Sequence, residues 1–96
     1  MLTIDTIRDI VSKVGKKYGI KNAYLFGSYA KGTANENSDV DLVIDKGELH
    51  TYRDYFHFCD ELETELGTDV DITSEDGMFP GFFELIKNDR ILLYGA

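Results

Sequence analysis

The sequence predicts a mixed α/β fold, in which a small mixed sheet is flanked by helices. Two long segments place apolar side chains three and four residues apart, which is the period of an amphipathic helix. Short apolar segments lie between and after them, and some alternate apolar with polar positions as strands do. Because the expected helices and strands alternate along the chain, each helix can pack its apolar stripe on a face of one sheet.

The first part of the chain predicts a helix, a strand and a second, short helix. Apolar residues recur at helical spacing over residues 4–18, and Gly19 follows as a signal that the helix ends. Residues 22–26 (NAYLF) are short, apolar and stopped by Gly27, so we expect a buried strand that runs directly into a turn. The second helix should begin near Ser28.

The middle of the chain predicts two more strands around a third helix. Residues 33–38 have the composition of a loop, and residues 39–45 then alternate as a strand does. Helical spacing over residues 52–66 ends at a glycine and predicts the third helix. Residues 69–73 alternate again, so we expect a further strand there.

The end of the chain predicts one more helix and one more strand. Pro80 suits the first turn of a last helix, and residues 91–94 (ILLY) are typical of a terminal apolar strand. Aromatic side chains in such a small domain more often fill the core than stack on bases. We expect core positions for Phe56, Phe58, Phe82 and Phe83.

Length and charge limit the classes of function. The 96 residues fit one domain, residues 1–96, and no long apolar segment or leader pattern is present, so we expect a soluble, cytoplasmic protein with no membrane partner. The formal net charge is −8, which would repel a polynucleotide backbone over most of the surface. Direct nucleic-acid binding is therefore not expected, whereas Mg²⁺ and a basic protein partner are compatible with this charge.

Cysteine and histidine give no ligand set for zinc. Cys59 is the only cysteine and lies within helical spacing, so we expect a buried, reduced thiol. His50 and His57 have no partner set with the spacing of a zinc site, and we expect them at the surface or in packing. These residue types therefore leave the chemistry to carboxylates.

Aspartates are the candidates for chemistry. Asp39 and Asp41 lie two residues apart on an expected strand, so their side chains leave the same face about 6.6–6.8 Å apart. If the later strand lies beside this one, Asp71 joins them from about 4.8 Å to the side, and three hard oxygen ligands suit two Mg²⁺ or Mn²⁺ ions. Asp69 shares the face of Asp71 and stays open as the alternative third ligand, whereas Asp45 is expected at the surface.

A glycine-serine turn precedes these carboxylates and decides between a metal site and an ordinary solvated strand edge. Gly27 has no Cβ where backbone must approach phosphate, and the Ser28 hydroxyl can donate a hydrogen bond. A helix that begins there points backbone N–H groups at an anion, and Lys31 adds a cation nearby. Without the carboxylates, the turn would be a strand-to-helix connection with a serine cap. Together, the two features predict a site for a nucleoside triphosphate.

This arrangement resembles the signature of the DNA polymerase beta-like nucleotidyltransferase superfamily, which is Gly-Ser, a short turn, Asp-x-Asp and a distant third Asp. Residues 26–32 (FGSYAKG), 38–42 (SDVDL) and 70–72 (VDI) are similar to the minimal nucleotidyltransferases, the antitoxin half of pairs with HEPN-domain toxins. The closing residues 91–94 also look like the ending of that family. The resemblance covers essentially the whole chain and implies the polymerase beta-like nucleotidyltransferase fold.

The resemblance also implies roles for the site residues. Gly27 and Ser28 would contact the triphosphate of ATP, Asp39 and Asp41 would bind both metal ions, and Asp71 would be the third carboxylate. At position 31 the family has arginine at least as often as lysine. Lys31 keeps the positive charge but lacks the guanidinium group, which can bind a phosphate through two parallel hydrogen bonds.

The function that the resemblance implies is transfer of AMP from ATP to a hydroxyl group of a HEPN ribonuclease toxin. The acceptor would be a tyrosine, and the transfer would silence the toxin. No part of the sequence is left for a domain that grips a base, a primer or an acceptor, so the acceptor site would be borrowed from the partner. Two alternatives stay open: a nucleotidyltransferase of a small molecule or an RNA end, and a non-catalytic subunit that neutralises its partner by contact.

Overall fold

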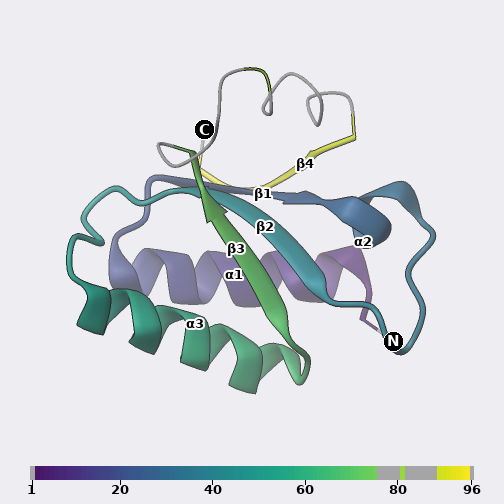
Figure 1. Ribbon diagram of the computed structural model, residues 1–96, viewed down its shortest axis with the longest axis horizontal. Coiled ribbons are helices and arrows are strands. Elements are labelled where there is room, and N and C mark those ends of the chain that lie inside the picture. Colours follow the sequence, from purple (N-terminus) through teal and green to yellow (C-terminus); the bar gives the residue numbers. More distant parts are fainter. Residues whose placement is uncertain (1, 76–80, 82–88, 96) are drawn as a thin grey trace.

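Two long helices pack against one face of a sheet whose described strands follow the order β3-β2-β1-β4 (Figure 1). The computed structural model describes residues 2–75, 81 and 89–95. The mixed α/β architecture predicted from the sequence is confirmed. In chain order, the elements are α1 (Ile4–Tyr18), β1 (Asn22–Phe26), α2 (Gly27–Lys31), β2 (Val40–Asp45), α3 (Tyr52–Leu66), β3 (Val70–Ser74) and β4 (Ile91–Tyr94).

The bounds of these elements agree closely with the sequence pattern. β2 and β3 each begin one residue later than predicted, so Asp39 and Asp69 lie just before the strands rather than in them. The helix predicted from Pro80 falls outside the described residues, as do Phe82 and Phe83. None of the helices in the described ranges has the length and hydrophobicity needed to cross a bilayer.

Local capping explains where the two long helices begin and end. Thr3 and Thr51 precede α1 and α3, and each hydroxyl accepts a hydrogen bond of 3.1 Å from the backbone N–H three residues on. Gly19 and Gly67 end these helices with φ angles of 77° and 71°, in the left-handed region that favours glycine. Both helices are therefore fixed at their ends by local residues, of which the two glycines were expected from the sequence.

The sheet is mixed because two of its strand pairs are antiparallel and the third is parallel. β1 pairs antiparallel with both β2 and β4, whereas β2 and β3 run parallel. Residues on one strand point alternately to the two faces. Leu42 and Ile44 of β2 therefore face α1 and α3 and are fully buried, and Asp41 points to the opposite face.

The core lies between the sheet and the two long helices. It includes one stripe from each helix and the inward positions of the strands. Its buried residues are Ile7, Val11, Val14, Ile20, Ala23, Leu25, Tyr29, Val40, Leu42, Ile44, Leu49, Phe58, Leu62, Leu66 and Leu93.

The buried stripe of α3 differs from the one that the sequence predicted. Phe58 and Leu62 are fully buried, as a core stripe requires. Phe56 was expected in the core and is instead 65% exposed, and Tyr52 is 85% exposed. Cys59 is half-buried rather than buried, and burial raises the pKa of its thiol. The prediction was wrong here because α3 carries apolar residues on two neighbouring strips, and only contact with the sheet decides which one is covered.

Candidate functional site

The turn that joins β1 to α2 lies directly against the carboxylate of Asp41. Phe26, the last residue of β1, is the register partner of Asp41 on β2. The next residue, Gly27, has a φ angle of 73°, and a Cβ atom built on it would collide with the Asp41 carboxylate and come within 3.1 Å of Cγ. Glycine is therefore required at this position twice, once for the backbone conformation and once for space.

Strand pairing sets Asp71 beside Asp41. The parallel register of β2 and β3 joins Asp41 to Asp71, so the two side chains leave the same face of neighbouring strands about 4.8 Å apart. Asp39 is exposed and lies one residue before β2. Asp69 is also exposed and lies before β3, where its carbonyl oxygen accepts a hydrogen bond of 3.0 Å from the backbone N–H of Val40. The strand pairing predicted for Asp71 is thus present.

The neighbouring aspartates affect one another's charge. Burial raises the pKa of Asp41 above its ordinary value of 3.8, and the charges of Asp71 and then Asp39 raise it further. Across residues 2–75, 81 and 89–95, no three His, Cys, Asp or Glu side chains are gathered tightly enough to enclose a metal ion. Asp41 and Asp71 are therefore a register pair with Asp39 close enough to act on the charge of Asp41, and the three do not form a closed ligand cage.

α2 places the other predicted residues around the same turn. Ser28 is half-buried in its first turn, and within the described part of the chain its hydroxyl makes no hydrogen bond. Its carbonyl oxygen accepts from the N–H groups of Gly32 and of Thr33, the latter at 2.9 Å, which closes the short helix. Lys31 is exposed in the last turn. The N-cap residue of α2 is Phe26, whose side chain has no oxygen, so the first N–H groups of this helix have no side-chain cap.

The remaining polar candidates lie elsewhere. His50 and His57 are exposed, as predicted. Asp45 was expected at the surface and is half-buried. Its Oδ1 accepts a hydrogen bond of 3.1 Å from the backbone N–H of Gly47, which fixes the turn after β2.

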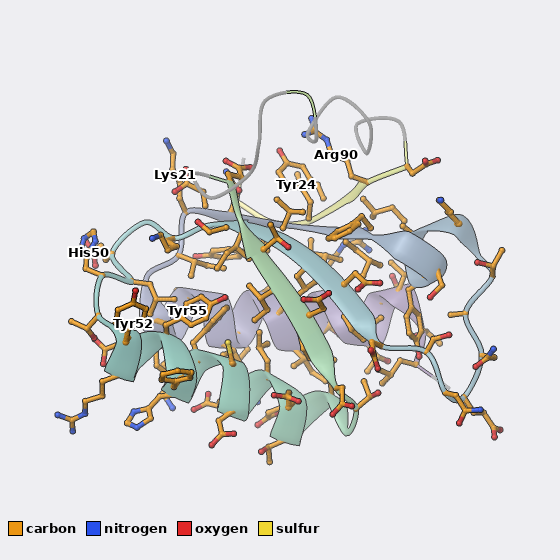
Figure 2. All side chains as sticks on the ribbon, in the orientation of Figure 1. Lys21, Tyr24, His50, Tyr52, Tyr55 and Arg90 are labelled. Carbon is orange, nitrogen blue, oxygen red and sulfur yellow. The ribbon has the colours of Figure 1, made fainter. Side chains whose placement is uncertain are left out.

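Sequence reasoning missed an arginine on the same face of the sheet as Asp41. The Arg90 guanidinium carbon lies 4.5 Å from the centre of the Tyr24 ring (Figure 2). Tyr24 is two residues before Phe26, the register partner of Asp41, so both side chains leave the same face. No local pattern could have indicated this pair, because it depends on β4 returning to pair with β1.

Comparison with known proteins gives one family. Residues 8–96 match the family described as Polymerase beta, Nucleotidyltransferase. The chain is 29% identical over 95 residues to the protein adenylyltransferase MntA of Thermococcus cleftensis. This match covers 95% of this chain and 96% of that protein. A solved structure provisionally described as a minimal nucleotidyltransferase is 33% identical, with a TM-score of 0.80, and the match covers 94% of this chain and 95% of that one.

A further solved structure has the same fold. It contains the tri-AMPylated HEPN toxin of Shewanella oneidensis in complex with MNT antitoxin, and one of its chains matches with a TM-score of 0.73. The match covers 98% of this chain and 74% of that chain, at 17% identity. At this level of identity the likeness concerns the fold alone.

Proposed function

The chain belongs to the polymerase beta nucleotidyltransferase family, and from this premise we propose that it transfers AMP from ATP to a hydroxyl group of a HEPN ribonuclease toxin. The acceptor hydroxyl belongs to a tyrosine, and the transfer makes the chain the antitoxin of that partner. The name of the relative MntA supports protein adenylylation. The AMPylated HEPN toxin in the Shewanella oneidensis complex supports the class of acceptor.

One observation carries the proposal: the glycine turn and the carboxylate pair are in direct contact. The space that a Cβ of Gly27 would fill is occupied by the carboxylate of Asp41, and Asp41 is paired in register with Asp71. A triphosphate bound at the turn therefore lies next to the carboxylates rather than at a distance from them. An ordinary strand-to-helix turn would not need this contact.

The donor set suits divalent magnesium. Asp39, Asp41 and Asp71 offer only hard carboxylate oxygens, which Mg²⁺ prefers and zinc sites seldom use alone. In this proposal Asp39 and Asp41 hold two Mg²⁺ ions and Asp71 completes the set; Mn²⁺ fits the same oxygens. When bound, such ions neutralise the triphosphate and lower the pKa of an attacking hydroxyl. The raised pKa of Asp41 agrees with this assignment, because crowded carboxylates lack a counter-charge without a cation.

The residues of the chain itself bind and orient the nucleotide. Backbone N–H groups at Gly27 and Ser28 face the phosphates, the Ser28 hydroxyl donates one hydrogen bond to them, and Lys31 adds a positive charge. The acceptor hydroxyl releases its proton to solvent and its oxygen forms a bond to the α-phosphorus, while the bond from the α-phosphorus to the oxygen of the β-phosphate breaks. AMP stays on the acceptor and pyrophosphate leaves. Holding the two reacting groups in line is the main contribution of these residues.

An intact-mass measurement on the partner tests the proposal. The chain and the HEPN-domain protein encoded beside it are purified separately and mixed with ATP and Mg²⁺. We expect the partner to gain the mass of at least one adenylyl group. Asp41→Asn should abolish the gain. Asp45→Asn is the control, because Asp45 lies four residues further along β2 on the same face, and it should leave the gain unchanged.

Two results would replace the proposal with another function. Label that appears on a small molecule or an RNA end, and never on the partner, would assign the chain to that class of nucleotidyltransferase. Neutralisation of the toxin by Asp41→Asn as effective as by the unmodified chain would mean that contact alone silences the partner.

A further inference from the structure

Two aromatic side chains on α3 are turned to solvent. Tyr52 is 85% exposed and Phe56 is 65% exposed, and their spacing of four residues puts them side by side on one strip of the helix. Glu63, one heptad after Phe56, continues that strip and is half-buried. Single exposed apolar residues are common on protein surfaces, but a contiguous pair marks a candidate interaction surface.

Two other sides of α3 are already in use. On one side, Glu61 and Glu65 make ion pairs of 2.7 and 2.9 Å with Lys17 and Lys13 of α1. On the side that faces the sheet, Phe58 is fully buried. The exposed strip therefore lies on the flank of α3 that turns away from α1.

This flank adjoins the edge of the sheet. β3 is the last strand on its side among the described strands, and the Tyr55 hydroxyl of α3 donates a hydrogen bond of 3.4 Å to the carbonyl oxygen of Ile72 in β3. We call the surface made by Tyr52, Phe56, Glu63 and the outer edge of β3 the α3–β3 face. An edge strand with an aromatic strip beside it is a common place for a protein partner to dock.

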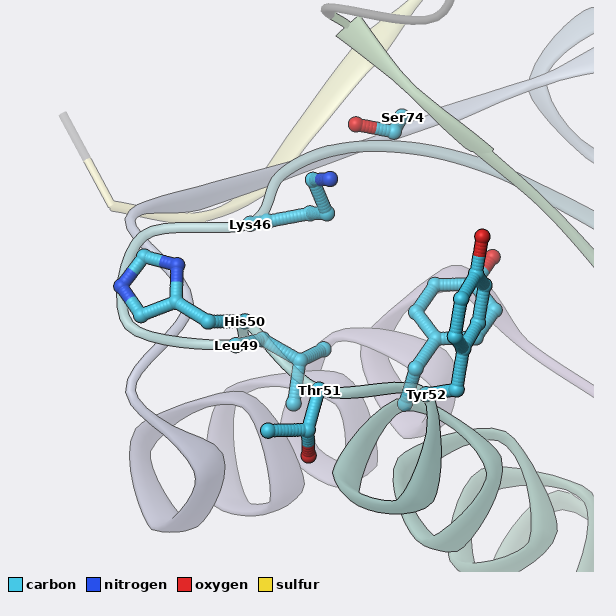
Figure 3. A pocket seen from close by; sticks show the side chains of 7 residues that line it. Lys46, Leu49, His50, Thr51, Tyr52 and Ser74 are labelled. Atoms are coloured by element: carbon cyan, nitrogen blue, oxygen red, sulfur yellow. The ribbon is translucent and has the colours of Figure 1, made fainter.

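A pocket opens at one end of the α3–β3 face. It has a volume of about 340 Å³ and lies between the start of α3 and the end of β3 (Figure 3). Tyr52 and Tyr55 form one wall and Leu49 contributes an apolar surface, while Lys46 and Ser74 lie across from Tyr52. A pocket of this kind accepts an apolar or aromatic anchor side chain, as central residues of protein interfaces often require.

The position and charge of the face indicate which partner it fits. Asp71 lies three residues before Ser74 on β3, about 10 Å along the strand, and this odd spacing turns the two side chains to opposite faces of the sheet. A docked protein therefore reaches from the pocket to the carboxylates around the outer edge of β3. At the opposite end of the face Glu63 is acidic, Asp69 lies next to that end, just before β3 and on the side of Asp71, and the chain as a whole has a net charge of −8. A partner with basic side chains beside an apolar anchor complements this pattern.

We infer that the α3–β3 face is the docking surface for the acceptor protein. A segment of the acceptor inserts an apolar side chain into the pocket beside Tyr52 and places Lys or Arg side chains against Glu63 and Asp69. From this surface the acceptor extends around the outer edge of β3, which brings its hydroxyl to the opposite face of the sheet, where Asp41 and Asp71 lie. The inference rests on the proposed function and adds to it the surface that selects the acceptor.

Alanine variants of the two exposed aromatics test the inference. The probe is the co-encoded HEPN-domain protein; its Kd for the chain, its KM as acceptor and the Kd for ATP are measured. Tyr52→Ala and Phe56→Ala should each weaken partner affinity about tenfold or more and raise KM for the acceptor, with ATP affinity unchanged. Arg53→Ala and His57→Ala are matched controls, one residue further on the same helix, and should stay within about twofold.

Charge reversal tests the acidic end of the face. Glu63→Lys should slow association with the partner and flatten its dependence on salt, because it removes attraction for basic side chains. Thermal melts of all variants should match that of the unmodified chain, because Tyr52 and Phe56 contribute little to the core.

The outcomes separate this inference from the proposed function. If the unmodified chain adenylylates the partner and Tyr52→Ala and Phe56→Ala do so equally well with equal affinity, the docking surface is wrong and the function stands. If the unmodified chain binds the partner but transfers nothing, the function fails and the affinity ratios still decide the docking surface. Self-association that both variants abolish, with partner affinity unchanged, would assign the face to a second copy of this chain and overturn the inference.

Discussion

Asp41 is the residue at which strand pairing, turn geometry and charge meet. Its carboxylate occupies the space beside Gly27, and its strand partners are Phe26 on one side and Asp71 on the other. In this position the carboxylate is partly buried and close to the charges of Asp71 and Asp39. The raised pKa of Asp41 is the result, with burial as the first cause and repulsion as the second.

This raised pKa predicts a pH-dependent difference in stability between the chain and its Asp41→Asn variant. Because the folded chain binds the Asp41 proton more tightly than the unfolded chain does, ionising Asp41 costs stability as pH rises from about 3.8 through the folded pKa. The variant carries no such charge, so its relative stability should increase over that window and then stay level. Urea unfolding in chelator between acidic and neutral pH measures this. A variant that is much less stable than the unmodified chain at neutral pH would show that the carboxylate is structural.

Removal of the Ser28 hydroxyl should weaken nucleotide use without loss of folding. One hydrogen bond to a charged phosphate is worth about 1.5–3 kcal/mol, which corresponds to a loss of about tenfold to a hundredfold in kcat/KM for Ser28→Ala. Lys31→Ala, at an exposed cation on the same helix, should act more mildly and lose its effect at high salt. Steady-state kinetics with varied ATP measure both. Unchanged kinetics for Ser28→Ala would exclude this hydroxyl from the site.

At the scale of elements, the sequence signalled most boundaries because local chemistry sets them. Gly19 and Gly67 end the two long helices as predicted. The Thr3 and Thr51 caps were not predicted, although they too act within a few residues of sequence. The contact of Gly27 with Asp41 was foreseen only in part. The need for glycine followed from the turn, but the neighbour that fills the missing Cβ position became visible only with the β1–β2 register.

Features that depend on packing between distant elements could not be obtained in the same way. Helical spacing in α3 fits more than one strip, and the choice of Phe58 over Phe56 for the core depends on where the sheet and α1 lie. Likewise, the alternating pattern predicted that the Asp71 side chain leaves the same face of its strand as its neighbours two residues away. The pattern did not show that β3 lies beside β2, which had to be assumed. The contact between Arg90 and Tyr24 had no local signal at all.

The two phenylalanines of α3 give a direct stability test of this packing. Phe58→Ala should lower the free energy of unfolding by about 3–5 kcal/mol, because it leaves a cavity beneath Tyr18, whose ring packs edge-on at 5.6 Å. Phe56→Ala should change it by no more than about 0.5 kcal/mol, because its side chain is mostly in solvent. Urea unfolding measures both variants. Equal losses would mean that both strips of α3 are covered.

At the scale of the whole molecule, charge governs how partners approach. A net charge of −8 on a chain of 96 residues gives a negative field over most of its surface. A protein that binds RNA needs a basic region, so the field attracts the proposed acceptor and repels free polynucleotide. The acidic end of the α3–β3 face concentrates this attraction near the carboxylates.

The association rate with the co-encoded HEPN-domain protein should therefore fall steeply with ionic strength. Screening shortens the range of the field from about 10 Å at 0.1 M salt to about 3 Å at 1 M, whereas dissociation should change little. Stopped-flow mixing across this range of salt measures both rates. An association rate that does not respond to salt would mean that apolar contact alone brings the two proteins together.

Metal dependence of the transfer tests most directly whether Gly27, Asp39, Asp41 and Asp71 form one nucleotidyltransferase site. Radiolabelled AMP is followed from ATP to the HEPN-domain protein as Mg²⁺ is titrated against excess chelator. We expect no transfer in chelator, recovery with Mg²⁺ or Mn²⁺, and no recovery at any concentration for Asp41→Asn. Full transfer in excess chelator, or full transfer by Asp41→Asn, would contradict the assignment of these carboxylates to the reaction.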